Sequence, residues 1–204
     1  MSYTALSQLV QAAMNNTLYN LSDQLFIHGP AFADIPRNTV IVSSPCCGPW
    51  ASTMKPEYTG DGGGRFPDLK WSTSLDDLME YLLVVEDPDA PLPDPVVHGI
   101  YYSIPATETG IVNDDLAATG DDNRVEGGFR FGQNRGGDVY LPPMPMPGHG
   151  PHRYFYEVVG LSEPLDLDSL SSSPSREEMA AAVDGKVAGW GAWMGVSEKG
   201  LTCN

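Results

Sequence analysis

Two short clusters of titratable side chains in this sequence combine carboxylates with imidazoles. The first is DPDAP at residues 87–91, which directly follows an apolar run. Its two prolines restrict the backbone, so Asp87 and Asp89 are held on a rigid turn. His98 follows soon afterwards and opens the next apolar run. We expect these three side chains to lie at adjacent strand ends.

The second cluster is the turn GHGPHRY at residues 148–154, which runs directly into another strand-like segment. If the strand ends converge, Asp87, Asp89, His98 and His152 meet at one rim. Imidazole N–H groups there can hold an anionic group, while carboxylates orient the rings and fix their tautomers. The same residues also suit acid–base catalysis, because an aspartate beside a histidine raises the histidine pKa toward neutrality.

Each motif also has a purely structural interpretation. DPDAP can be a stiff β-turn that contributes no ligand contact. Arg153 suits an ion pair with one of the two DPDAP carboxylates better than a ligand contact. His149 stands between glycines, so we expect its side chain to be exposed.

Composition and charge exclude several classes of partner. The chain of 204 residues has 27 Asp and Glu against 11 Lys and Arg, which gives a net charge of -16. Such a surface repels both nucleic acid and anionic membranes. No apolar run approaches the roughly 20 residues that span a bilayer, and the first residues lack the pattern of a secretory signal. We therefore expect a cytoplasmic protein with no nucleic-acid partner and no integral membrane association.

The sequence shows no metal or cofactor motif. Cys46, Cys47 and Cys203 form neither a disulfide framework nor a metal-binding spacing. The glycine-rich stretch around residues 60–64 lacks the Lys-Ser/Thr ending of a phosphate-binding loop. We expect no metal and no cofactor, with Cys46 and Cys47 packed near a strand end.

The 22 Gly and 18 Pro residues, together with short apolar runs, predict a mainly β protein. Segments rich in β-branched and aromatic residues predict strands at 39–43, 80–86, 96–104 and 153–161. The apolar segment 187–196 predicts a buried closing element.

Helices are expected near both ends of the chain. Ser175 and Glu178 form a capping box that opens a short helix. Apolar residues spaced by three and four over residues 4–21 predict an amphipathic helix, which docks on the body or forms a homodimer with a second copy. We expect residues 1–204 to form a single domain, made of a helical extension at 1–35 and a core at 36–197.

The order of the motifs resembles the signature pair of the phosphatidylethanolamine-binding proteins. DPDAP, a short spacer, His98 and a Gly/Pro loop ending in G-x-H-R-Y carry the resemblance. It extends from about residue 36 to about residue 197, and includes PDLKW at 67–71 and GKVAGW at 185–190. It implies a β-sandwich of two packed antiparallel sheets, one larger than the other, with peripheral helices at the N- and C-terminal ends.

The resemblance also implies a pocket at the strand ends that accepts phosphate, acetate or phosphoryl head groups. Family members act as head-group binders, as kinase or protease inhibitors and as signalling scaffolds, mostly without catalysis or metal. Matched residue by residue, the family's pocket corresponds to Asp87, Asp89, His98 and His152, with Tyr154 beside them.

Several positions depart from the family pattern. Gly99 stands where the family usually has a tryptophan, and Pro142 replaces a glycine and offers no N–H to an anion. Met144 and Met146 add soft apolar bulk of the kind that adapts to irregular organic molecules. We therefore include Gly99, Pro142, Met144 and Met146 among the expected ligand contacts, in a pocket that is roomier and more apolar than a phosphate site.

Two functions follow from these residues. The first is a small-molecule binding protein for an anionic or oxygenated organic ligand, with a regulatory or inhibitory role. The alternative is a scaffold converted to a cofactor-free enzyme of the isomerase, cyclase or dehydratase type, acting on a hydrophobic oxygenated metabolite. In that case His98 or His152 moves the proton, and Asp87 or Asp89 orients the imidazole.

Overall fold

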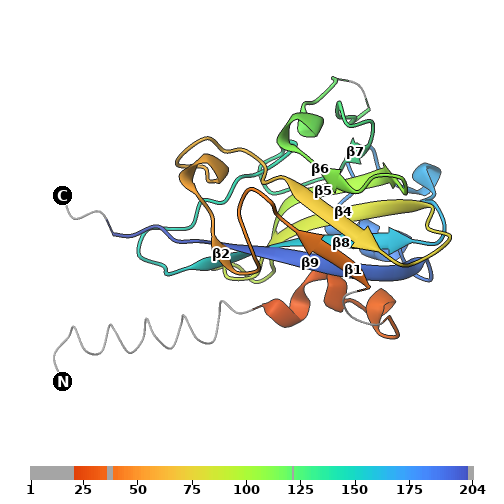
Figure 1. The fold of residues 1–204 in the computed structure, drawn as a ribbon, viewed down its shortest axis with the longest axis horizontal. Helices are drawn as coiled ribbons and strands as arrows, with labels where there is room; N and C mark the ends of the chain where they lie inside the picture. The colour runs from red at the N-terminus through yellow and green to blue at the C-terminus, as the bar shows by residue number, and fades with distance from the viewer. Residues whose placement is uncertain (1–20, 36–38, 121, 202–204) are drawn as a thin grey trace.

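Two β-sheets form the centre of the molecule (Figure 1). The computed structural model describes residues 21–35, 39–120 and 122–201. The strands in these residues are β1 (Val40–Ser43), β2 (Ser52–Thr53), β3 (Leu69–Thr73), β4 (Glu80–Asp87), β5 (Val96–Pro105), β6 (Gly110–Ile111), β7 (Arg130–Phe131), β8 (His152–Leu161) and β9 (Val187–Ser197). They form a three-stranded sheet in the order β1-β3-β6 and a six-stranded sheet in the order β2-β9-β8-β4-β5-β7. The expected mainly β fold of two sheets is confirmed, and the short β2 is parallel to β9.

One α-helix lies among the described residues, α2 (Arg176–Ala182), and it begins at the expected capping box. The Ser175 hydroxyl accepts a hydrogen bond from the Glu178 N–H, and the Glu178 carboxylate accepts one from the Ser175 N–H. The remaining helical turns are of the 3-10 type: η1 (Ser22–Gln24), η2 (Phe26–His28), η3 (Pro30–Phe32), η4 (Pro56–Tyr58), η5 (Asn113–Leu116) and η6 (Leu167–Ser169). The helix expected over 4–21, and with it the dimer, falls on residues outside the described ranges apart from its last residue.

The larger sheet is buried on both faces, because alternate residues of β4 point to opposite sides. Tyr81, Leu83 and Val85 join the core between the two sheets. Leu82 and Val84 face the other way and join a second core, formed with the η1–η3 segment and α2. Each fully buried side chain of this size contributes about 1.5–3 kcal/mol, so the central strands form a rigid support.

The antiparallel order of the central strands explains how the distant motifs meet. Strand β4 lies between β5 and β8 and is antiparallel to both. The end of β4 at Asp87 therefore lies beside the start of β5 and beside the start of β8. These starts carry His98 and His152, so one edge of the sheet gathers all three side chains.

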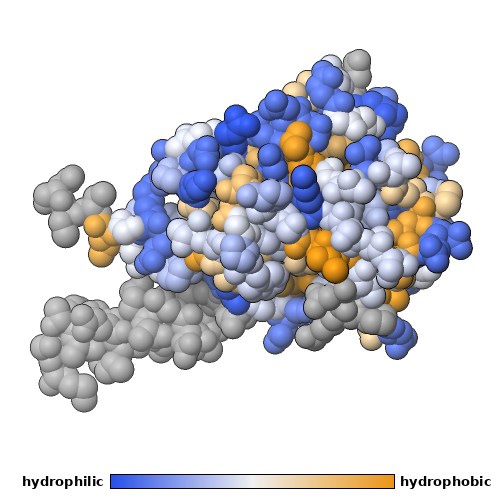
Figure 2. All heavy atoms as spheres, viewed as in Figure 1, coloured by the Kyte–Doolittle hydropathy of each residue, from blue (hydrophilic) through white to orange (hydrophobic). Residues whose placement is uncertain are grey.

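The visible surface is mainly hydrophilic. Figure 2 shows that hydrophilic residues cover most of the visible face, with apolar residues in small separate patches. None of the described helices is long and apolar enough to cross a bilayer.

Candidate functional site

A cavity of about 270 Å³ opens where the three strand ends meet. Its lining residues are Asp87, Ala90, Pro91, Leu92, Val96, His98, Arg135, Leu141, Pro142, Met144, Met146, His152 and Tyr154. The expected site residues are thus brought together, with the exception of Asp89 and Gly99. The walls are mainly apolar, and a few polar groups converge on the interior, which is the usual composition of a small-molecule site.

A β-bulge aims His98 into this cavity. Val85 pairs with Gly99 while Glu86 pairs with Val97, so β5 carries one extra residue at His98. A bulge of this kind redirects a side chain at the edge of a site. The imidazole of His98 stands edge-on to the ring of Tyr154, with 5.1 Å between the ring centroids.

The hydrogen bonds of His98 define what it can offer a ligand. Its Nδ1 lies 2.7 Å from the carbonyl oxygen of Leu141; a carbonyl only accepts, so Nδ1 carries the proton. The side chain is 4% exposed, and burial lowers the pKa of His98 below its usual value. The ring is therefore neutral at neutral pH. Its Nε2 is a bare acceptor, buried and with no hydrogen-bond partner in the described structure.

A chain of hydrogen bonds links Asp87, His152 and His149. The Nδ1 of His152 donates to Asp87 over 2.8 Å, and its Nε2 lies 2.8 Å from the Nδ1 of His149. The other oxygen of Asp87 accepts from the backbone N–H groups of Asp89 and Ala90. Burial and the neighbouring His152 lower the pKa of His149. Asp87 thus orients His152 as expected, whereas His149, expected to be exposed, is half-buried and hydrogen-bonded.

Asp89 faces a different partner. Both of its oxygens accept hydrogen bonds from the guanidinium of Arg153, at 2.6 and 2.8 Å, and one also accepts from the Arg153 backbone N–H. This bidentate pair ties the DPDAP turn to the start of β8. Asp89 therefore positions the rim of the site but does not line the cavity, and Arg153 has the structural role that the sequence suggested.

The loop at residues 141–146 forms an apolar wall of the cavity. Met144 and Met146 are 58% and 56% exposed and line the opening together with Pro142. Because Pro142 and Pro143 have no backbone N–H, this wall offers an anion no donor at two successive positions. The wall matches the apolar pocket that the sequence suggested.

Gly99 lies behind the site. It is absent from the cavity wall, and a Cβ atom placed on it would come 2.6 Å from the Tyr101 hydroxyl and 2.8 Å from its Cε2 atom. The buried Tyr101 ring occupies that space, and its hydroxyl donates to the carbonyl of Val139. The space beside Gly99, where the family usually has a tryptophan side chain, is thus filled by the Tyr101 ring. The glycine does not enlarge the cavity.

Several cavity residues were not found from the sequence: Ala90, Pro91, Leu92, Val96, Arg135 and Leu141. Ala90 and Pro91 belong to the DPDAP motif and could have been included with it. Leu141 contacts His98 through its backbone carbonyl. Every residue has such a group, so the residue type does not indicate this contact. Arg135 lies in a polar excursion that shows no motif, so only the fold brings it to the cavity.

Within the described residues, no group of three or more His, Cys, Asp or Glu side chains is arranged to hold a metal ion. Cys46 and Cys47 are half-buried thiols that pack against the core between the sheets. Burial raises the pKa of the Cys47 thiol to about 12. Neither cysteine is among the residues that line the cavity.

The fold and the cavity define a β-sandwich protein with a small-molecule site at its strand ends. The family model of the phosphatidylethanolamine-binding proteins matches residues 50–198, and the chain belongs to this family. The solved structure of Escherichia coli YbcL, titled a member of the mammalian PEBP family, superposes with a TM-score of 0.65 at 24% identity and covers 78% of this chain and 98% of that one. At this identity the likeness concerns the fold.

Two curated relatives share more sequence. A protein of Talaromyces stipitatus called phomoidride biosynthesis cluster protein B is 44% identical, over 86% of this chain and 74% of its own length. A protein of the same name from another fungus is 39% identical, over 93% of this chain and 94% of its own length.

Proposed function

We propose that this protein binds a small, oxygenated and largely apolar metabolite in the His98 cavity, as part of a secondary-metabolite pathway. The carrying observation is the buried Nε2 of His98, an acceptor without a partner at the wall of a mainly apolar cavity. The pathway rests on the two relatives named for a phomoidride biosynthesis cluster.

The state of His98 supports a particular kind of ligand group. A buried acceptor without a partner costs about 1–3 kcal/mol, which a ligand hydroxyl or acidic hydrogen would recover by donating to it. A phosphate group would instead face the lone pair of Nε2, unless His98 first took up a proton against its lowered pKa. Pro142 and Pro143 add no donors. The cavity therefore favours a hydrogen-bond donor on an apolar body over a phosphorylated head group.

The test is native mass spectrometry on protein purified from cells of its source organism, with His98→Asn as the informative variant. The asparagine amide can still donate to the Leu141 carbonyl, as Nδ1 does, but nothing replaces the acceptor at Nε2. The wild-type protein is expected to carry a phosphate-free, oxygenated small molecule, and the variant is expected to lose it.

His28→Asn is the matched control, because His28 is exposed on η2 and lies away from the cavity. This control should retain the molecule at the wild-type level. A phospholipid or another phosphorylated mass in the wild-type protein would overturn the proposal. Equal retention by His98→Asn would place the ligand elsewhere.

Proton transfer is a second candidate function, favoured by the His149–His152–Asp87 chain beside the cavity. In this reaction His98 Nε2 takes a proton from an acidic position of the bound molecule and becomes an imidazolium. The proton then returns to another position of the same molecule, so the reaction is an isomerisation with no net gain or loss of atoms. His152 lines the same cavity, so a bound molecule in contact with it could exchange protons with solvent through the His152–His149 pair.

Incubation of the co-purified metabolite with the protein in D₂O tests this candidate. The wild-type protein should introduce deuterium at the acidic position, and His98→Asn should lower the rate at least tenfold, in line with the usual contribution of a general base of about 100-fold or more. If deuterium entered the metabolite no faster with the protein than in buffer alone, proton transfer would be excluded and ligand binding would remain the proposed function.

A further inference from the structure

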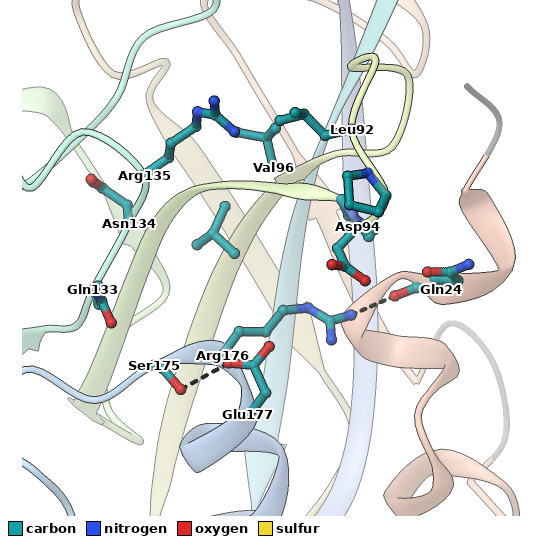
Figure 3. A pocket seen from close by; sticks show the side chains of 13 residues that line it. Gln24, Leu92, Asp94, Val96, Gln133, Asn134, Arg135, Ser175, Arg176 and Glu177 are labelled. Atoms are coloured by element: carbon teal, nitrogen blue, oxygen red, sulfur yellow. Dashed lines mark hydrogen bonds between the residues drawn. The ribbon is translucent and has the colours of Figure 1, made fainter. Parts of the chain in front are cut away.

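A second cavity, of about 400 Å³, adjoins the His98 cavity (Figure 3). Leu92, Val96 and Arg135 line both cavities, so these three side chains form a shared wall. The His98 cavity alone is slightly smaller than the roughly 300–1,000 Å³ typical of sites for organic ligands. A molecule that extended past the shared wall would have room well within that range.

The two cavities differ in polarity. Polar and charged side chains line the larger one, which includes Gln24, Asp94, Gln133, Ser175 and Arg176. Figure 3 shows the Arg135 side chain directed toward Val96 and Leu92, away from Arg176 and Glu177. Arg135 therefore stands at the point where an apolar chamber meets a polar one.

Arg135 differs from the arginines nearby in having no ion-pair partner among the described residues. Arg153 binds Asp89, and Arg176 binds Glu86, whereas the exposed guanidinium of Arg135 has no ion pair or hydrogen bond with any described residue. In a chain with a net charge of -16, an unpaired arginine at a cavity is a local site for an anionic group. It is also the sole Lys or Arg among the described residues that line the His98 cavity.

We propose that Arg135 is a specificity-determining residue that binds a carboxylate of the ligand. This inference rests on the proposed function and deepens it: the ligand is a hydroxy acid or a comparable acid with a second donor group. Its donor hydrogen faces His98, its apolar body lies against Met144 and Met146, and its carboxylate binds the guanidinium at the entrance to the larger cavity.

The chemistry of the guanidinium supports a carboxylate. Arginine presents parallel N–H donors that match the two oxygens of a carboxylate. One guanidinium neutralises one negative charge, and the prolines of the opposite loop add no donors for a phosphate dianion. Because Arg135 is exposed, its ion pair with a ligand carboxylate is expected to add little affinity. Its main effect is on specificity, because it favours acidic ligands over uncharged ones.

Isothermal titration calorimetry with ω-hydroxyalkanoates, from hydroxybutanoate to hydroxydodecanoate, tests the inference at neutral pH. The α,ω-diols of the same chain lengths are the uncharged comparison. The wild-type protein should prefer one hydroxy acid over its matched diol by about fivefold, the upper end for an exposed ion pair. In Arg135→Gln this preference should fall to less than twofold, because the acid loses more affinity than the diol does.

Arg65→Gln is the control variant, because Arg65 is exposed and lines neither cavity. It should keep the full preference for the acid. A preference retained in Arg135→Gln would overturn the role of Arg135 while leaving the proposed function intact. If His98→Asn bound the diols as well as the wild-type protein does, or if the wild-type protein bound none of the probes, the proposed function and this inference would both fail.

Discussion

Glu86 and Asp87 are consecutive residues of β4, and their side chains enter two very different environments. Asp87 points to the face that carries the cavity, where it accepts hydrogen bonds from His152 and two backbone N–H groups. Glu86 points to the opposite face, where it accepts hydrogen bonds from Arg176 and from the Phe26 N–H. Successive side chains of a strand point to opposite faces of the sheet, so two consecutive residues of β4 enter two different buried clusters.

The two carboxylates of the cluster around Glu86 line neither the His98 cavity nor the larger cavity beside it. Glu86 and Glu157 are both fully buried beneath the η1–η3 segment and α2. Burial raises the pKa of Glu157 well above its usual value, and the neighbouring Glu86 raises it further. The nearby Ile27 N–H offsets part of this rise in pKa, but neither carboxylate oxygen of Glu157 makes a hydrogen bond of normal geometry with a described residue, and His98 Nε2 also lacks one.

The comparison teaches that burial and a shifted pKa do not by themselves mark a ligand site. Both clusters have a buried polar atom without a partner. His98 itself lines a cavity that a ligand could enter. Glu86 and Glu157 line neither that cavity nor the larger one beside it, which is reached on their side by Arg176, and Phe26 and Ile27 belong to the packed core that covers them. This difference supports the proposed ligand binding at the first cluster, whereas the second cluster holds the η1–η3 segment against the larger sheet through the Glu86–Phe26 hydrogen bond.

The largest expected effect comes from Arg176→Met. This change leaves the carboxylate of Glu86 buried without its ion-pair partner, which should lower the free energy of unfolding by about 3–5 kcal/mol. Urea unfolding monitored by circular dichroism measures it. A double variant that adds Glu86→Gln should recover much of the loss, because the uncompensated charge is then gone.

His152→Ala is the matched change in the open cluster. Asp87 keeps its two backbone donors, so this variant should lose only about 1–3 kcal/mol and stay folded. It should nevertheless lose binding of the co-purified metabolite. If Arg176→Met were no more destabilising than His152→Ala, the distinction between a fastening cluster and a binding cluster would be wrong.

Gly99→Ala is expected to have the next largest effect. The new methyl group would meet the hydroxyl and ring atoms of the buried Tyr101 at 2.6–2.9 Å, and such overpacking costs about 1–3 kcal/mol. Thermal unfolding with and without the metabolite separates stability from binding. Metabolite binding should change little, because Gly99 lies behind the wall. A stable variant with a smaller cavity would show instead that Gly99 faces the ligand.

Glu157→Gln is expected to have the smallest effect, seen as a change in pH dependence. The pKa of Glu157 is raised in the folded protein, so above about pH 4.5 the unfolded chain releases a proton that the folded chain retains, and stability falls as pH rises. Each pH unit costs the wild-type protein at most about 1.4 kcal/mol relative to the variant. Urea midpoints at several pH values measure this difference, and parallel curves for the two proteins would contradict it.

The fold was predictable to a large extent. The strand segments expected at 80–86, 96–104 and 153–161 lie within β4, β5 and β8 as observed, because their β-branched and aromatic residues are buried on both faces. The meeting of Asp87, His98 and His152 followed from strand ends alone. The helix over 4–21, the dimer and the single-domain division stay predictions.

The finer features of the site required three-dimensional contacts. Neither the bulge at His98 nor the hydrogen bond from its Nδ1 to the Leu141 carbonyl follows from residue types, yet together they decide that Nε2 is an acceptor. Arg135 reaches the cavity from a polar excursion without a motif. The space beside Gly99 is filled by Tyr101, two residues further along the same strand, which a sequence comparison with a tryptophan does not reveal.

The central claim is that His98 presents a neutral acceptor to the cavity. Nitrogen NMR of isotope-labelled protein, with His98→Asn used to assign the signal, measures the protonation of each ring nitrogen directly. At pH 7 we expect a proton on Nδ1, none on Nε2, and a midpoint of titration below the usual 6.5. Addition of the co-purified metabolite should shift the Nε2 signal. An imidazolium at pH 7, or a proton on Nε2 in the absence of ligand, would contradict the account and restore an anion-holding site.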